Sequence, residues 1–174
     1  EFIRGIDAPR PLYLVGQSMG GAISLTVALE EPEAIDGLVL VGTGARLKVA
    51  PALLEALAEG RMDPFFVRLS FSPRANPELI EEYIASQADV PANTFYQDFL
   101  ACSVFDVTQR VGEIKLPTLI VVGLDDKMTP LKLSHFMHEN IKGSQLVTIE
   151  NAGHMTMIEQ PEELNKAINS FVSA

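Results

Sequence analysis

The chain has 174 residues, 47% of them hydrophobic, and this length and composition predict one compact domain with an apolar core. Its formal net charge of −10, with 13 Lys and Arg scattered along the chain, argues against a nucleic-acid partner. A single cysteine, Cys102, excludes an internal disulfide and favours a reducing, cytoplasmic setting, and no apolar run is long enough for us to expect a membrane span.

Four short apolar runs predict β-strands, at residues 11–16, 37–42, 117–123 and 145–149. Runs that are apolar on both faces are typical of parallel strands covered by helices on both sides, and we predict that the first of them is a central strand. Because helical patterns alternate with these runs, the predicted fold class is α/β, with three α/β/α layers around a mostly parallel sheet.

Two helices are predicted to pack on this sheet. Residues 18–31 are apolar on most faces, which predicts a buried helix after the first strand. The last helix begins behind Pro161 and is amphipathic, with apolar residues spaced at i, i+3, i+4, i+7 and i+8: Leu164, Ala167, Ile168, Phe171 and Val172.

The chain divides into two core parts and one insertion. Residues 44–116 contain no predicted strand, only helical stretches near 51–60, 63–71, 77–87 and 92–105. We therefore expect residues 1–43 and 117–174 to form the core and residues 44–116 to be a helical insertion.

The first strand leads into Gly16-Gln17-Ser18-Met19-Gly20, a G-x-S-x-G pattern that opens a predicted helix. The glycines of this pattern, Gly16 and Gly20, permit a tight, strained turn that lifts the Ser18 hydroxyl above the sheet, where the start of the helix directs its dipole. The alternative is that Ser18 only caps the helix, a common role for serine.

Two further loops follow predicted strands, and each carries a side chain suited to catalysis. Asn151-Ala152-Gly153-His154 follows the last strand, and Gly123 to Pro130 contains the adjacent acids Asp125 and Asp126. A lone histidine is usually an ordinary surface residue. However, the carboxyl ends of parallel strands meet at one edge of the sheet, so a serine, a carboxylate and a histidine are expected there together.

In these three segments the sequence resembles the α/β-hydrolase family: VGQSMGG at the nucleophile turn, GLDDKMTP at the acid loop and NAGHMTMIEQPEE at the histidine loop. The resemblance implies a partial α/β-hydrolase fold in which residues 44–116 form a lid. It also implies a catalytic triad of Ser18, Asp126 and His154, with Asp126 favoured over Asp125 because the family acid stands fourth in G-x-x-D. The N–H of Met19 would then bind the oxyanion.

The family also has several strands and a second oxyanion donor before the nucleophile turn, and this sequence shows neither. We therefore expect either that an N-terminal segment is missing or that a swapped homodimer or a partner chain supplies the remainder. A strand left without its neighbour would expose unpaired backbone groups.

The implied activity is hydrolysis of carboxylic esters or related acyl compounds, with Gln17, Phe95, Phe99 and Met155 binding the small-molecule substrate. The phenylalanines could instead only hold the insertion together. A lactonase, a C–C hydrolase, a thioesterase and a perhydrolase are alternatives within the fold, and a non-catalytic binding module is the rival from another class. Ser18 in the nucleophile position argues against dehalogenation.

No metal or cofactor is predicted. His135 and His138 are spaced i, i+3 on the helix that follows the acid loop, but the sequence offers no third ligand.

Overall fold

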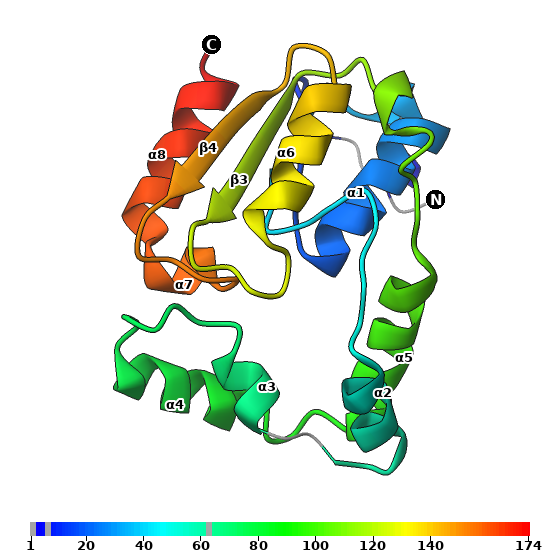
Figure 1. Cartoon of the computed structure of the whole chain (residues 1–174). Coiled ribbons are helices and arrows are strands. Elements are labelled where there is room, and N and C mark those ends of the chain that lie inside the picture. Colours follow the sequence, from blue (N-terminus) through cyan, green and yellow to red (C-terminus); the bar gives the residue numbers. More distant parts are fainter. Residues whose placement is uncertain (1–2, 6–7, 62–63) are drawn as a thin grey trace.

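The computed structural model describes residues 3–5, 8–61 and 64–174 (Figure 1). Its strands are β1 (Tyr13–Gln17), β2 (Gly37–Val41), β3 (Thr118–Gly123) and β4 (Gln145–Ile149). They form one sheet in the order β1-β2-β3-β4, and every neighbouring pair is parallel. The predicted parallel sheet is therefore confirmed, with strand boundaries within two residues of those expected.

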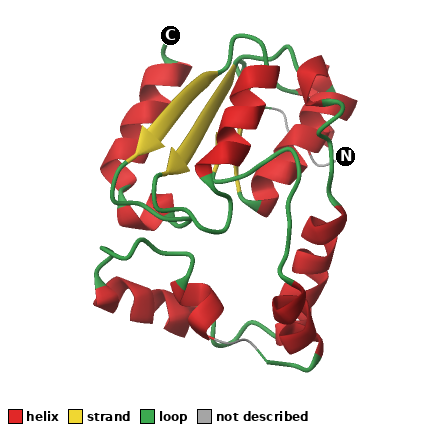
Figure 2. Ribbon diagram, viewed as in Figure 1, coloured by secondary structure: helices red, strands yellow, loops and turns green. Residues whose placement is uncertain are grey.

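Helices cover both faces of this sheet (Figure 2). Leu38, Leu40 and Ile120 share a core with residues of α1 (Met19–Glu30) and α6 (Leu131–Asn140). The residues between them in sequence point to the opposite face, because side chains alternate along a strand. There Val39, Val41 and Val121 pack with Leu164 and Phe171 of α8 (Pro161–Val172), so the three-layer α/β/α class is confirmed.

The prediction that the first strand is central is wrong for the described chain. β1 lies at one edge of the sheet, and Val15 in this strand is 52% exposed. β2 and β3, in contrast, are buried along their whole length. An apolar run predicts a strand, but it does not tell how many neighbours that strand has.

Residues 44–116, called the helical segment below, contain α2 (Pro51–Ala58), α3 (Pro64–Arg68), α4 (Pro77–Ser86) and α5 (Ala92–Val104). In its described part the segment forms no strand, only an isolated bridge between Arg46 and Asp106. In Figure 1 the arrowheads of β3 and β4 point toward α3 and α4, so these helices lie beyond the carboxyl ends of the strands. That the segment is a separate unit acting as a lid stays a prediction.

Four short helices complete the described structure: η1 (Ile3–Gly5), η2 (Pro32–Ala34), η3 (Val111–Glu113) and α7 (Thr156–Glu159). Within the described ranges, every helix is too short or too polar to cross a lipid bilayer.

Candidate active site

Ser18 occupies a strained turn between β1 and α1. Its backbone has φ 51° and ψ −117°, a region that residues with a side chain rarely adopt and that costs about 1–3 kcal/mol. Two hydrogen bonds hold it there: Ser18 N–H donates to the carbonyl of Val41 at 3.0 Å, and the Thr43 hydroxyl, Oγ1, donates to the carbonyl of Ser18 at 2.8 Å. Although Ser18 stands at the N-cap of α1, its hydroxyl makes no capping hydrogen bond, which disfavours a role limited to capping.

The turn depends on close contact between β1 and α1. A Cβ atom at Gly16 would lie 2.3 Å from the carbonyl oxygen of Gly20 and 2.4 Å from Ser24 Oγ, distances that real atoms do not reach. Gly16 therefore allows α1 to start directly against the end of β1, which places Ser18 at the carboxyl edge of the sheet.

Asp126 and His154 form a buried pair at the same edge. Asp126 follows β3 and His154 follows β4, and His154 Nδ1 lies 2.9 Å from Asp126 Oδ2. The Asp126 side chain is fully buried, and its Oδ1 accepts hydrogen bonds from the N–H groups of Met128 and Thr129 at 2.9 and 2.8 Å. A carboxylate at Nδ1 favours the tautomer with hydrogen on that nitrogen, which leaves Nε2 free to act as a base.

Asp125 points to a different place. Its Oδ2 accepts a hydrogen bond from Ser72 Oγ at 2.6 Å and lies 3.6 Å from a guanidinium nitrogen of Arg74. The structure thus brings Asp126, and not Asp125, to His154.

Two residues that the sequence did not single out also contact the pair. Thr129 Oγ1 donates to Asp126 Oδ2 at 2.7 Å and lies 3.1 Å from His154 Nδ1. Gly42, at the end of β2, has φ 50°, and a Cβ atom there would lie 3.2 Å from Asp126 Oδ2 and 3.3 Å from His154 Nδ1. The only sequence signal for Thr129 was its position three residues after Asp126, and Gly42 had none.

Ser18 and His154 line one cavity of about 210 Å³. No hydrogen bond joins the Ser18 hydroxyl to His154 among the described residues. The N–H of Met19 is the first of α1, directly after Ser18, and makes no backbone hydrogen bond within the described ranges. The segments after β1 and β4 therefore bring a hydroxyl and a histidine to one cavity, and an N–H without a backbone partner stands directly after the serine.

The residues expected to bind substrate all line this cavity or the one beside it. Gln17, Phe99 and Met155 line the first cavity, and Phe95 lines the second, which measures about 90 Å³. Gln17 also donates from Nε2 to the carbonyl of His154 at 3.1 Å, so its amide connects the serine turn to the histidine loop.

The histidine loop is bound to the helical segment. The N–H groups of His154 and Met155 both donate to the carbonyl of Ser70, at 2.7 and 3.2 Å. Glu159 accepts from Gly153 N–H at 2.7 Å with one carboxylate oxygen and from Ser72 N–H at 2.6 Å with the other. Burial raises the pKa of Glu159, more than these two hydrogen bonds lower it.

His135 and His138 do not lie in this site. His138 Nδ1 is 3.0 Å from Ser144 Oγ, and the described residues contain no group of three or more His, Cys, Asp or Glu side chains placed to hold a metal ion.

Comparison with known proteins shows to which family the chain belongs. The family model described as serine aminopeptidase, S33, matches residues 1–161. A proline iminopeptidase of Saccharolobus solfataricus is 26% identical over 192 residues, which cover 92% of this chain and 62% of that protein. The chain thus spans less than two thirds of that relative's length.

Solved structures of esterases share the fold of this chain. A thermophilic esterase superposes with a TM-score of 0.82 at 37% identity, over 91% of this chain and 64% of that one. An esterase from Exiguobacterium antarcticum superposes with a TM-score of 0.84 at 25% identity, over 94% of this chain and 67% of that one. The chain therefore belongs to the α/β-hydrolase family, in the branch that the S33 serine aminopeptidase model describes.

Proposed function

We propose that the protein hydrolyses carboxylic esters through Ser18, His154 and Asp126. The observation that carries the proposal is the strained, uncapped Ser18, which lines the same cavity as a histidine held at Nδ1 by a buried carboxylate. Backbone strain at a nucleophile is typical of sites where the geometry serves chemistry.

In this mechanism His154 Nε2 takes the proton of Ser18 Oγ while that oxygen attacks the ester carbonyl. Asp126 stabilises the imidazolium that results, and the N–H of Met19 donates to the oxyanion of the tetrahedral intermediate. The C–O bond to the alcohol then breaks, and His154 returns the proton to the leaving oxygen. Water, deprotonated by His154, attacks the acyl–Ser18 ester, which releases the acid and restores Ser18.

Esters fit the cavity better than N-terminal peptides do. The relatives include both esterases and a proline iminopeptidase, and an enzyme of the second kind must bind the ammonium group of its substrate. No Asp or Glu is among the described residues that line the cavity around Ser18, whereas Lys48 does line it. An ammonium group would meet a like charge there and no carboxylate, which favours an uncharged ester.

Covalent labelling tests the proposal against the non-catalytic binding module. A fluorophosphonate probe should attach to Ser18, as located by peptide mapping, and Ser18→Ala should lose both the label and the hydrolysis of p-nitrophenyl butyrate. Ligand binding without labelling, or turnover that survives in Ser18→Ala, would contradict it. Ser24→Ala is a matched control, because Ser24 is a buried serine of α1 whose hydroxyl donates to the carbonyl of Gly20.

A panel of lactones, thioesters, diketones and a peroxide acceptor, run beside simple esters, separates the alternatives within the fold. Gln17, Phe95, Phe99 and Met155 are proposed as substrate contacts on the basis of their place along the two cavities. The assembly state and the cytoplasmic setting stay predictions from the sequence.

A further inference from the structure

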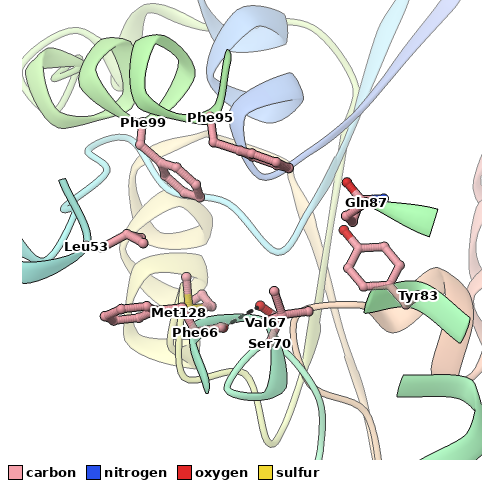
Figure 3. Close-up of a pocket in the computed structure, with 9 residues that line it drawn as sticks. All are labelled: Leu53, Phe66, Val67, Ser70, Tyr83, Gln87, Phe95, Phe99 and Met128. Carbon is pink, nitrogen blue, oxygen red and sulfur yellow. Dashed lines mark hydrogen bonds between the residues drawn. The ribbon is translucent and has the colours of Figure 1, made fainter. Parts of the chain in front are cut away.

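Beside the cavity around Ser18 lies a second, largely apolar cavity of about 90 Å³ (Figure 3). Ser70, Tyr83, Phe99 and Met128 line both, so the two spaces are adjacent. The second cavity is otherwise walled mainly by apolar side chains of α2, α3 and α5, namely Leu53, Phe66, Val67 and Phe95. An alkyl chain or a ring attached to an ester at Ser18 can therefore leave water by entering it.

Two polar side chains lie together on one wall of this apolar space. Tyr83 and Gln87 are four residues apart, at and just beyond the last turn of α4, and in Figure 3 the Tyr83 hydroxyl points toward the Gln87 amide, across the cavity from Leu53. The Tyr83 ring is fixed by an edge-to-face contact with Phe71, with ring centroids 5.5 Å apart. The orientation of the hydroxyl is thus set by packing.

Both side chains have hydrogen-bonding capacity left over. Among the described residues the Tyr83 hydroxyl makes no hydrogen bond, and burial raises the pKa of Tyr83, which keeps the phenol protonated and able to donate. Gln87 donates from Nε2 to Ser86 Oγ at 3.0 Å, which leaves its amide oxygen to accept. One donor and one acceptor side by side match a single hydroxyl group, which can accept from Tyr83 and donate to Gln87.

The cavity carries no charge to complement an ion. None of its described lining residues is Asp, Glu, Lys or Arg, and Arg68 nearby on α3 is paired with Glu81 at 2.6 Å. Burial of a carboxylate or an ammonium group without a partner is strongly unfavourable, whereas a hydrogen-bonded hydroxyl is tolerated.

We propose that the second cavity binds the apolar part of an ester that carries a hydroxyl group at its far end, and that Tyr83 and Gln87 recognise this hydroxyl. The inference rests on the proposed reaction at Ser18 for its biological meaning. The recognition itself can be measured by binding alone, so the two proposals can fail separately.

Binding is measured by calorimetry with two uncharged amides, ω-hydroxyoctanamide and nonanamide, which differ by a hydroxyl in place of a methyl group. We expect the hydroxy amide to bind about 3–10-fold more tightly, the effect of one or two neutral hydrogen bonds. Tyr83→Phe and Gln87→Met, which keep the shape of each side chain, should each bring this ratio toward one. Tyr96→Phe and Gln97→Met remove the same groups from residues of α5 that do not line the cavity, and should leave the ratio as it is.

Turnover is measured with the matching p-nitrophenyl esters, as the ratio of the two kcat/KM values in each variant. A preference for the hydroxy ester that is lost in Tyr83→Phe and Gln87→Met supports the inference. Ser18-dependent turnover with no preference in either assay overturns it and leaves the esterase proposal intact. A binding preference without any Ser18-dependent turnover supports the hydroxyl site and overturns the esterase proposal.

Discussion

Asp125 and Asp126 are adjacent in sequence, yet only one of them contacts the histidine. Asp126 is fully buried and bonded to His154 Nδ1, whereas Asp125 is bonded to Ser72. We predict that Asp126→Asn lowers kcat for ester hydrolysis by about 10³–10⁴-fold, because an amide at Nδ1 favours the wrong tautomer of the imidazole. Asp125→Asn should change kcat by no more than about 10-fold, since it alters a contact outside the pair.

Steady-state kinetics on the two variants tests which aspartate acts as the acid of the triad. Circular dichroism confirms that both variants are folded. Equal losses in the two variants would show that the acid role is not confined to Asp126, and a larger loss in Asp125→Asn would reverse the assignment.

Gly42 gives a second prediction at the residue scale. Gly42→Ala would place a methyl group against the Asp126–His154 pair as well as straining a backbone with φ 50°, whereas Gly143→Ala meets a similar strain at φ 80° with no atom within 4 Å. We expect both variants to lose about 1 kcal/mol of unfolding free energy. Only Gly42→Ala should also lose kcat, by about 10-fold or more, because the pair must shift.

Urea unfolding and steady-state kinetics are measured on both glycine variants. Together they separate the effect of backbone strain from that of displacing the Asp126–His154 pair. The idea would be wrong if kcat fell equally in both, or in neither.

The sequence predicts a site residue when the segment around that residue carries the signal, and not when its contacts form only in the folded chain. Ser18 and His154 were predicted because each follows a recognisable strand and the strands share one edge. Gly42 and Thr129 were missed, because their importance arises only when the ends of β2, β3 and β4 come together in space. A single sequence carries no signal for a glycine that is required by a side chain more than 80 residues away.

At the scale of elements, α7 connects the histidine loop to the helical segment through Glu159. Each of its carboxylate oxygens accepts one backbone N–H, from Ser72 and from Gly153, while burial raises its pKa. A raised folded-state pKa means that the folded protein binds this proton more tightly than the unfolded chain does. Protonated Glu159 therefore makes its whole contribution to the free energy of unfolding below its ordinary pKa of 4.5. That contribution is lost as the pH rises through the raised pKa of the folded protein.

We therefore predict that the unfolding free energy of the wild type, minus that of Glu159→Gln, falls as the pH is raised from below 4.5 to neutral. The other ionisable groups are common to both proteins, so their contributions largely cancel in this difference. Urea titrations across the range provide the measurement, and Glu162→Gln, exposed on α8, shows the effect of removing one charge from the surface. A difference that stays constant or rises with pH would contradict the prediction.

Most helices and strands were predictable, because burial leaves a pattern of apolar residues in the sequence. The failures occur where this pattern is too short or does not report the neighbours of a strand. The run 117–123 is apolar because both faces of β3 are covered, and the amphipathic spacing in 161–172 matches the one face of α8 that packs on the sheet. α7 was not predicted, because four residues are too few to show a helical period. The edge position of β1 was also missed, because apolar composition reports burial and not the number of neighbours.

At the scale of the whole molecule, the sheet and the helical segment contribute different parts of one site. The carboxyl ends of β1, β3 and β4 carry Ser18, Asp126 and His154, which are fixed by backbone and buried contacts. The helical segment supplies most of the apolar walls of the two cavities and binds to the histidine loop through Ser70 and Ser72. If the proposed reaction occurs at Ser18, its chemistry lies on the sheet and its substrate selection on the helical segment, which is the arrangement expected when binding residues lie outside the regular scaffold.

The open edge of the sheet gives the last prediction. In the described chain β1 pairs only with β2, and Val15 on β1 and Ile23 on α1 are 52% and 56% exposed. An uncovered apolar edge strand offers unpaired N–H and C=O groups to a second strand, so the 174-residue chain should self-associate as its concentration rises. Val15→Lys should reduce this association, because a charged side chain on an edge strand disfavours pairing with another copy.

Val104→Lys is the matched control, since Val104 is 76% exposed on α5 and does not belong to the sheet. Sedimentation velocity at several concentrations compares the three proteins. If the edge drives association, Val15→Lys sediments as a monomer at concentrations where the wild type and Val104→Lys do not. Equal association in all three proteins would place the contact elsewhere. A wild-type chain that stays monomeric at every concentration would contradict the prediction and show that β1 is stable at the sheet edge with β2 and α1 as its neighbours.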